Sequence, residues 1–220
     1  RRMIDEAKLD AVIIAPPAHP HVPAAMRACQ AGLALYVEKP LSLTVAEGRH
    51  LAQAVRRYGR VCQVGSQQRS MEMNRFASQF VRDGGLGKVT HVQVGNFTGP
   101  MPHAGLAEEP ILDGLDWDLF CGPAPLRPHN WRLWIKDERQ VDGQNWRGWD
   151  MWRDYSGHLM TNWGGHSVDQ AQWALGMDDS GPMEVWPVTD GYQGEIRQCP
   201  VVARYANGVE LRFELTYLRG

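Results

Sequence analysis

Residues 11–69 decide the fold: AVIIAPPAHPHVPAAMRACQAGLALYVEKPLSLTVAEGRHLAQAVRRYGRVCQVGSQQR. This stretch holds three short apolar runs of the kind found in buried strands, at 11–15, 33–37 and 60–64. The residues between the runs have the apolar spacing of helices. Strand, helix, strand, helix, strand with short links predicts parallel strands covered by helices, which is half of a doubly wound sheet.

The ends of the two predicted helices carry their own signals. Gly32 and Gly59 are placed to stop them, and Thr44-Val45-Ala46-Glu47 has the form of a capping box at the start of the second helix. Parallel strands all end at one edge of the sheet, where ligands of such sheets bind. We therefore expect three separate segments, 16–21, 38–40 and 65–69, to converge at a ligand edge.

The chain changes character after a helix predicted near 71–82. A strand is expected over 89–97, then an irregular Pro- and Trp-rich stretch to about residue 156, then a helix over 164–175. Strands at 201–205 and 209–216, joined through Ala206-Asn207-Gly208, predict a hairpin, because Asn-Gly supplies the positive φ angles of a type I′ turn. We predict a second, α+β domain with a mostly antiparallel sheet, and boundaries at 1–66 and 67–220.

Composition narrows the function classes. A net charge of −2 over 220 residues gives no electrostatic reason to expect nucleic acid or an anionic membrane as partner. No apolar run reaches the roughly 18 residues of a membrane helix. The four cysteines have no paired C-x-x-C spacing, so we expect buried free thiols.

The first residues resemble mid-helix and the last follow a strand-like run, so we expect a piece truncated at both ends, with no readable localisation beyond a cytoplasmic default.

The sequence contains no G-x-G-x-x-G motif. Several of its segments nevertheless resemble the Gfo/Idh/MocA (glucose–fructose oxidoreductase/inositol dehydrogenase) family downstream of its dinucleotide-binding loop. They are VIIAPPAHPHVPAA (12–25), LYVEKPLSLTVAEG (35–48), QVGSQQRS (63–70), LDWDLFCGPAP (115–125) and DYSGHLMTNWGGHSVDQAQWALG (154–176). The resemblance implies a Rossmann-type first domain that binds NAD or NADP, between which the sequence does not choose. Without the phosphate loop, we expect the 220-residue chain to bind dinucleotide poorly.

The resemblance also implies roles for individual residues. The lysine of the Glu38-Lys39-Pro40 run, Lys39, would be catalytic: it hydrogen-bonds the reacting hydroxyl, and the Lys39–Pro40 peptide would be cis. The residues implied to lie along the dinucleotide are Pro17, His21, Glu38, Lys39, Pro40, Gln67 and Arg69.

His166 is the candidate acid/base, because imidazole titrates in the useful range. At about 100° per residue, its helix carries an apolar stripe opposite to it, made of Val168, Ala171 and Leu175. On the histidine's own side the helix carries Asn162, Asp169, Gln170 and Trp173. His166 is therefore predicted to lie off the buried stripe, among polar groups.

Asn162 departs from the family, which has Asp four residues before the histidine. An amide can hydrogen-bond the imidazole but cannot stabilise the imidazolium by charge, so we expect a less basic His166 unless Asp169 or Asp154 supplies the carboxylate. Together with Lys39 and His166, Asn162 completes the predicted catalytic set.

Substrate contacts are predicted for Tyr155 and Trp163 beside Lys39, Asn162 and His166, although loop packing also explains Tyr155. Eight of the nine tryptophans lie between 117 and 173, and indoles both stack on sugar rings and fill cores. We expect one or two of them to contact sugar. His19 and His21 lack a third ligand in register, so no metal site is predicted.

These features lead to one principal hypothesis and three alternatives. The principal one is hydride transfer between NAD(P) and a secondary hydroxyl of a sugar, cyclitol or glycoside, in a homo-oligomer (dimer or tetramer) built through the second domain's sheet. The alternatives are a glycosidase that oxidises, eliminates and reduces again, a non-catalytic sugar or cofactor sensor, and a metal-dependent sugar isomerase.

Overall fold

The computed structural model describes residues 2–95, 97–134, 137–141, 144–146, 148–194 and 196–214, with no account of the side chains of 137–141 and 144–146. The chain forms two compact units. The first unit comprises Arg1–Gly65 and Pro100–His158, and the second comprises Ser66–Gly99 and Leu159–Gly220. The domain boundaries predicted from the sequence, 1–66 and 67–220, stay a prediction.

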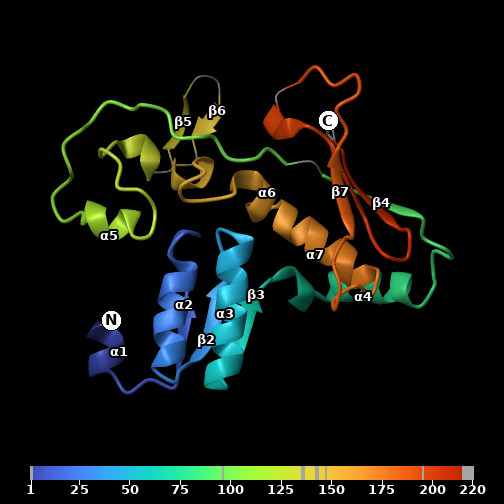
Figure 1. Ribbon diagram of the computed structural model, residues 1–220, viewed down its shortest axis with the longest axis horizontal. Coiled ribbons are helices and arrows are strands. Elements are labelled where there is room, and N and C mark those ends of the chain that lie inside the picture. Colours follow the sequence, from blue (N-terminus) through green and yellow to red (C-terminus); the bar gives the residue numbers. More distant parts are fainter. Residues whose placement is uncertain are drawn as a thin grey trace. The chain divides into compact units, whose positions relative to one another are not determined.

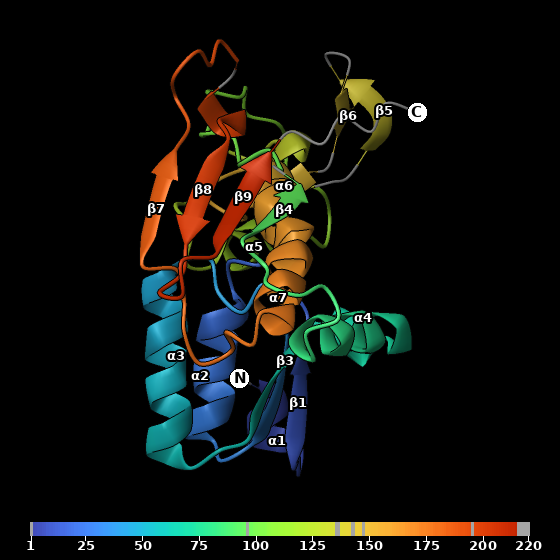
Figure 2. The same ribbon diagram turned by 90° about the vertical axis from the view of Figure 1, so that its right-hand side faces the viewer.

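The first unit contains a three-stranded parallel sheet, in the order β1 (Ala11–Ile14), β2 (Ala34–Glu38), β3 (Cys62–Gly65). Helices α2 (His21–Gln30) and α3 (Val45–Tyr58) lie on the same side of it (Figures 1 and 2). Alternate strand residues face these helices, so the core gathers the inward members of each strand, among them Val12, Leu35 and Val37. The short helix α1 (Arg2–Glu6) precedes β1.

Helix α3 has the predicted ends. Thr44 accepts a hydrogen bond from the Glu47 backbone N–H while the Glu47 carboxylate accepts from the Thr44 backbone N–H, which is the complete capping box. At the other end Gly59 has φ 60°, the left-handed conformation that glycine adopts without a Cβ penalty. Both ends of α3 were therefore readable from local sequence.

Residues 100–158 belong to the first unit and contain only short elements. These are α5 (Trp117–Cys121), η2 (Trp131–Leu133), β5 (Asp137–Val141), β6 (Gln144–Trp146) and η3 (Gly148–Met151). A parallel bridge joins Met101 to Trp152 near the two ends of the segment. The sequence predicted an irregular stretch, and a second buried cluster centred on aromatic side chains holds it together.

The second unit contains a four-stranded sheet in the order β4 (His91–Gly95), β9 (Glu210–Glu214), β8 (Val201–Arg204), β7 (Glu184–Pro187). The β4–β9 pair is parallel and the other two pairs are antiparallel. Helix α7 (Gly164–Ala174) packs on one face through the predicted apolar stripe, where Ala171 is buried among Val94, Leu211 and Phe213. The remaining elements are η1 (Gln68–Ser70), α4 (Glu72–Arg82), α6 (His158–Asn162) and η4 (Ile196–Gln198).

The predicted fold class, half of a doubly wound parallel sheet followed by an α+β part, is confirmed.

The predicted turn of the β8–β9 hairpin is wrong. A type I′ turn requires positive φ at both central residues, but Asn207 is not among the positive-φ residues and only Gly208, at φ 83°, is. The Gly208 N–H donates to the Tyr205 carbonyl at 2.9 Å, so the chain turns before Gly208 and the glycine absorbs the left-handed conformation, as in a turn followed by a bulge. Residues 215–216 of the predicted strand lie outside the described residues.

Two further expectations concern the whole chain. All four cysteines are free; Cys29, Cys121 and Cys199 are buried and Cys62 is half-buried. Burial raises the pKa of the Cys29 and Cys62 thiols. Among the described helices, none combines the length and apolarity needed to cross a bilayer.

Candidate functional site

The carboxyl edge of the three-stranded sheet brings together the turns that follow β1 and β2. Pro16 and Pro17 follow β1, while Lys39 and Pro40 follow Glu38, the last residue of β2. The Lys39–Pro40 peptide is cis, as the family resemblance implied. Lys39 is half-buried at this edge, so the convergence expected from the strand order holds for these two segments of the first unit.

His21, the first residue of α2, lies beneath both turns. Its ring is 1% exposed, with Nδ1 2.7 Å from the Pro40 carbonyl oxygen and Nε2 2.9 Å from that of Pro16. The sequence predicted a dinucleotide contact for His21. In the structure its two nitrogens contact the main chain of the turns that flank it.

His19 ties the same loop to residues 100–158. Its Nε2 lies 2.7 Å from the Phe120 carbonyl oxygen, and its ring centroid is 4.9 Å from that of Tyr155. Burial lowers the pKa of His19. Tyr155 has no exposed surface, and its hydroxyl lies 3.8 Å from the Cys121 sulfur; burial and this contact raise the pKa of Tyr155. These contacts show that Tyr155 packs in the first unit, and its predicted contact with substrate stays a prediction.

Most tryptophans of the first unit are core residues. Trp117 and Trp152 are buried, and three more are packed against the same cluster: Trp131, Trp134 and Trp149. The side chain of Trp146 lies outside the described residues. Of the tryptophans considered as sugar contacts, these five are therefore accounted for by packing.

A buried trio of polar side chains escaped the sequence reasoning. The Ser156 hydroxyl donates to Asp150 at 2.9 Å, and His158 Nδ1 lies 3.1 Å from the Asp150 carbonyl oxygen. All three residues are buried. Because the serine donates to the aspartate and not to the histidine, the arrangement is not that of an activated nucleophile. It fixes the chain where it enters α6.

In the second unit, Asn162 ends α6 and His166 lies in the first turn of α7. Trp163 between them has helical dihedrals (φ −94°, ψ −38°), and the Ser167 N–H donates to its carbonyl, so the helical path continues across the junction. The Trp163 indole is 53% exposed, and its ring centroid lies 6.0 Å from that of His166. An exposed indole therefore stands beside the candidate acid/base.

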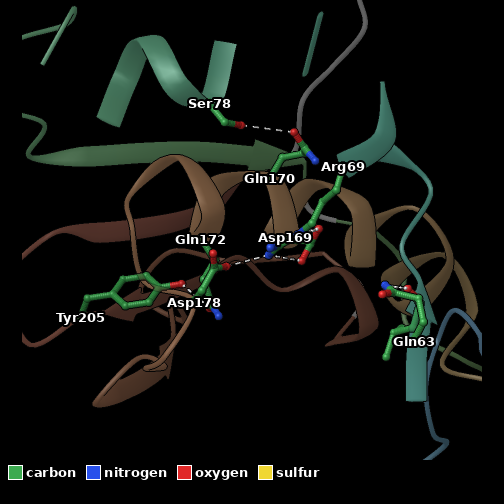
Figure 3. Close-up of polar contacts among 9 residues, drawn as sticks. Gln63, Arg69, Ser78, Asp169, Gln170, Gln172, Asp178 and Tyr205 are labelled. Atoms are coloured by element: carbon green, nitrogen blue, oxygen red, sulfur yellow. Dashed lines mark hydrogen bonds and ion pairs between the residues drawn. The ribbon is translucent and has the colours of Figure 1, made fainter. Parts of the chain in front are cut away.

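Arg69 makes a clamp at the other end of α7 (Figure 3). Its guanidinium donates to both carboxylate oxygens of Asp169 at 2.8 Å and to Asp178 at 2.7 Å, and lies 5.3 Å from the Trp173 ring centroid. The two carboxylates raise the pKa of Arg69. The sequence predicted that Arg69 lies along the dinucleotide. In the second unit its side chain contacts Asp169, Asp178 and Trp173, and no local sequence pattern indicated the two aspartates as partners.

The contacts of Arg69 decide whether Asp169 is available to replace the carboxylate that Asn162 lacks. Asp169 presents both oxygens to Arg69, and Asp154, the other candidate, pairs with Arg127 at 2.9 Å in the first unit. Each replacement considered from the sequence is thus an arginine partner.

Gln67, also predicted near the cofactor, has an uncommon backbone. Its φ of 55° and ψ of −61° form a γ-turn of the rare, positive-φ kind, and the Gln68 N–H donates to the Ser66 carbonyl across it. Such conformations in a non-glycine residue cluster at functional sites. The sequence carried no glycine or Asx signal for this turn.

Two family models match the chain. One, described as the oxidoreductase family NAD-binding Rossmann fold, matches residues 1–66, and the C-terminal alpha/beta domain of the same family matches residues 75–211. The chain belongs to the Gfo/Idh/MocA oxidoreductase family. Of the curated proteins, it is similar to scyllo-inositol 2-dehydrogenase (NAD(+)) of Bacillus subtilis strain 168, with 31% identity over 86 residues, 39% of this chain and 25% of that protein.

Several solved structures share the fold of this chain. The WlbA dehydrogenase of Bordetella pertussis, solved with NADH and UDP-GlcNAcA, has a TM-score of 0.61 at 19% identity, covering 98% of this chain and 52% of that one. Aldose-aldose oxidoreductase of Caulobacter crescentus, complexed with glycerol, has a TM-score of 0.57 at 21% identity, covering 96% and 52%. This chain therefore spans about half the length of these solved relatives.

The residue types at the end of β2 are compatible with one end of a dinucleotide. Lys39 carries an ammonium and Glu38 a carboxylate, a donor and an acceptor of the kinds that bind ribose and carboxamide groups. No residue is assigned to the diphosphate, because the sequence has no glycine-rich phosphate turn. Within the described residues, no three His, Cys, Asp or Glu side chains are grouped to hold a metal ion.

Proposed function

We propose that this Gfo/Idh/MocA protein is an NAD(P)-dependent oxidoreductase that transfers a hydride between nicotinamide and a secondary hydroxyl of a sugar, cyclitol or glycoside. The observation that carries the proposal is Lys39, at the carboxyl end of β2 in a sheet that an NAD-binding family model matches. The similarity to an inositol dehydrogenase supports a polyhydroxylated substrate.

Lys39 and His166 divide the work on the substrate hydroxyl. The ammonium of Lys39 donates a hydrogen bond to the hydroxyl oxygen and orients it. The imidazole of His166 takes the hydroxyl proton as the carbon is oxidised and returns it in the reverse direction. The bound nicotinamide supplies the hydride acceptor or donor.

The substrate class is argued from the surroundings of His166. An indole that is 53% exposed, 6.0 Å between ring centroids from the imidazole, offers a flat apolar surface for the carbon face of a sugar or cyclitol ring. Among the described tryptophans, Trp163 is the one whose exposure and neighbour both suit this role. Trp173 has Arg69 over its ring.

The test is NAD(P)H formation by the full-length protein across a panel of sugars, cyclitols and glycosides. We expect activity with at least one of them, and losses in kcat of about 10²–10³-fold for Lys39→Met and about 10²–10⁴-fold for His166→Asn. Lys88→Met, an exposed lysine of the second unit, is the matched control and should leave kcat unchanged. Wild-type activity in Lys39→Met would overturn the role of Lys39, and glycoside cleavage without net NADH would point to the oxidation–elimination glycosidase.

The second candidate is a sensor that binds sugar or cofactor without turnover. Asn162 favours the sensor. The family has an aspartate at this position, and the two aspartates that could supply the absent carboxylate are paired with arginines. Asn162→Asp separates the two functions. In an enzyme the new carboxylate stabilises the imidazolium, so the acid limb of the pH–rate profile moves to higher pH. Silence of the wild type on the whole panel, with cofactor bound, would support the sensor.

We also propose that two copies associate through the face of the four-stranded sheet that α7 does not cover (Figure 2). This face alternates in charge. Arg204 pairs with Glu184 and Glu210 at 3.1 Å, and Arg212 pairs with Glu210 at 2.8 Å. Both arginines lower the pKa of Glu210. A surface with both signs interspersed can face its own copy about a two-fold axis without a net repulsion.

A further inference from the structure

The two ring nitrogens of His21 both meet acceptors. Nδ1 is 2.7 Å from the carbonyl oxygen of Pro40 and Nε2 is 2.9 Å from that of Pro16, in a side chain that is 1% exposed. A carbonyl oxygen only accepts, whereas a neutral imidazole has one N–H and one lone pair. The neutral ring would therefore set a lone pair against a carbonyl oxygen at one of the two contacts. An imidazolium donates at both.

The contacts join two points of the chain that matter to the proposed site. Pro16 follows β1, and Pro40 follows Lys39 at the end of β2. The Pro40 carbonyl is only one residue beyond Lys39, so holding it limits where the Lys39 main chain can move. Hydrogen bonds from a charged donor are shorter and stronger than neutral ones, which suits a rigid tie.

We propose that His21 is a positioning residue: as an imidazolium it ties the Pro16 and Pro40 carbonyls together and so fixes Lys39 at the carboxyl edge of the sheet. The importance of Lys39 rests on the function proposed above, but the bridge itself does not. The two carbonyl acceptors stabilise a buried positive charge that would otherwise be costly.

Several charged or titratable groups lie close to this bridge along the chain. His19 lies two residues earlier in the same loop; burial lowers its pKa and the electrostatic effect of His21 adds to this, which keeps the neighbouring ring neutral. Glu47 of α3 acts on His19 in the opposite sense. Glu38, the last residue of β2, and Lys39 come directly before Pro40, whose carbonyl His21 contacts. The N-terminus of α2, which His21 begins, opposes a positive charge, so the two carbonyls must outweigh it.

The first test reads the protonation of the ring directly. In the full-length protein labelled with ¹⁵N-histidine, a long-range ¹H–¹⁵N spectrum at pH 7.5 should give protonated-type shifts for both His21 nitrogens, with the signals assigned by their loss in His21→Gln. One unprotonated-type nitrogen would overturn the imidazolium. The ¹³C resonance of the Pro40 carbonyl should move in His21→Phe, because its donor is removed; an unmoved resonance would overturn the tie.

The second test reads the consequence for catalysis. His21→Phe should lower kcat by about 10²-fold, the effect of a displacement of about 1 Å in a catalytic group, with a much smaller change in KM. His21→Gln, which keeps two N–H donors on one nitrogen, should recover part of that loss, and it serves as the readable variant if His21→Phe does not fold. His50→Gln, an exposed histidine of α3, is the matched control and should match the wild type.

The outcomes separate the two proposals. A wild-type kcat in folded His21→Phe would overturn the positioning role even if the ring is an imidazolium. A wild type inactive on the whole substrate panel would count against the proposed function. The bridge would then be tested by the ¹⁵N shifts of the His21 ring and the ¹³C resonance of the Pro40 carbonyl alone.

Discussion

The buried side chain of His19 makes the free energy of unfolding depend on pH. Burial lowers its pKa from the ordinary value of 6.5, so the folded protein keeps the ring neutral where the unfolded chain takes a proton. Its contribution to stability is therefore complete above about pH 6.5 and is lost as the pH falls toward the lowered value. We expect the free energy of unfolding to fall in this window by up to about 1.4 kcal/mol per pH unit on account of this one group.

The measurement is urea unfolding from pH 7.5 to 5 on the wild type and on His19→Gln. The variant should be less stable at pH 7.5, because the contact with Phe120 changes, but its stability should fall less steeply below pH 6.5. Parallel pH profiles for the two proteins would show that His19 does not carry the effect.

The tertiary contacts of single residues could not be predicted from the sequence. The strand order placed Lys39 at a ligand edge without any view of the structure. It could not distinguish His21, which contacts two carbonyls, from a histidine beside a cofactor, because both lie on the same loop. The partners of Arg69 were equally hidden, since Asp169 and Asp178 lie more than ninety residues away in the chain. Contacts of this kind depend on tertiary structure and leave no local pattern.

At the scale of an element, α3 offers a test of a cap. Thr44→Ala removes the acceptor for the Glu47 backbone N–H and should cost about 1 kcal/mol of stability. Thr44→Ser keeps a hydroxyl at the same place and should stay close to the wild type. Unfolding by urea measures both. Because the two halves of the box depend on each other, Thr44→Ala with Glu47→Ala should lose less than the sum of the single changes, and strict additivity would contradict the box.

Elements with local signals were predicted well, and those without them were not. The capping box, Gly59 and the apolar stripe of α7 are written within a few neighbouring residues, and each holds in the structure. The β8–β9 turn shows the opposite: Asn207-Gly208 suits a type I′ turn, yet the chain reverses before Gly208. The pairing of the strands, and not the dipeptide, decides which residues occupy the turn.

At the scale of the whole molecule, self-association through the charged sheet face can be measured by light scattering after gel filtration. We expect a dimer or tetramer of the full-length protein. Arg204→Glu puts a third carboxylate between Glu184 and Glu210, a row of three like charges that would face the same row of the second copy, and should shift the mass toward the monomer. Arg82→Ala, an exposed arginine of α4, is the control and should keep the wild-type mass. A monomeric wild type would remove the proposal.

The parallel pairing of β4 with β9 has a consequence for how the protein is made. Residues 91–95 sit next to residues 210–214 in the sheet, with almost the whole second half of the chain between them. The ribosome must therefore release the last strand before the first can find its neighbour, and until then β4 is an unpaired edge. The three parallel strands of the first unit come within 65 residues and can pair early. Synthesis should thus pass through a stage in which the three parallel strands of the first unit are paired while the other sheet awaits its central strand, a period when chaperone binding would be concentrated on the apolar side of β4.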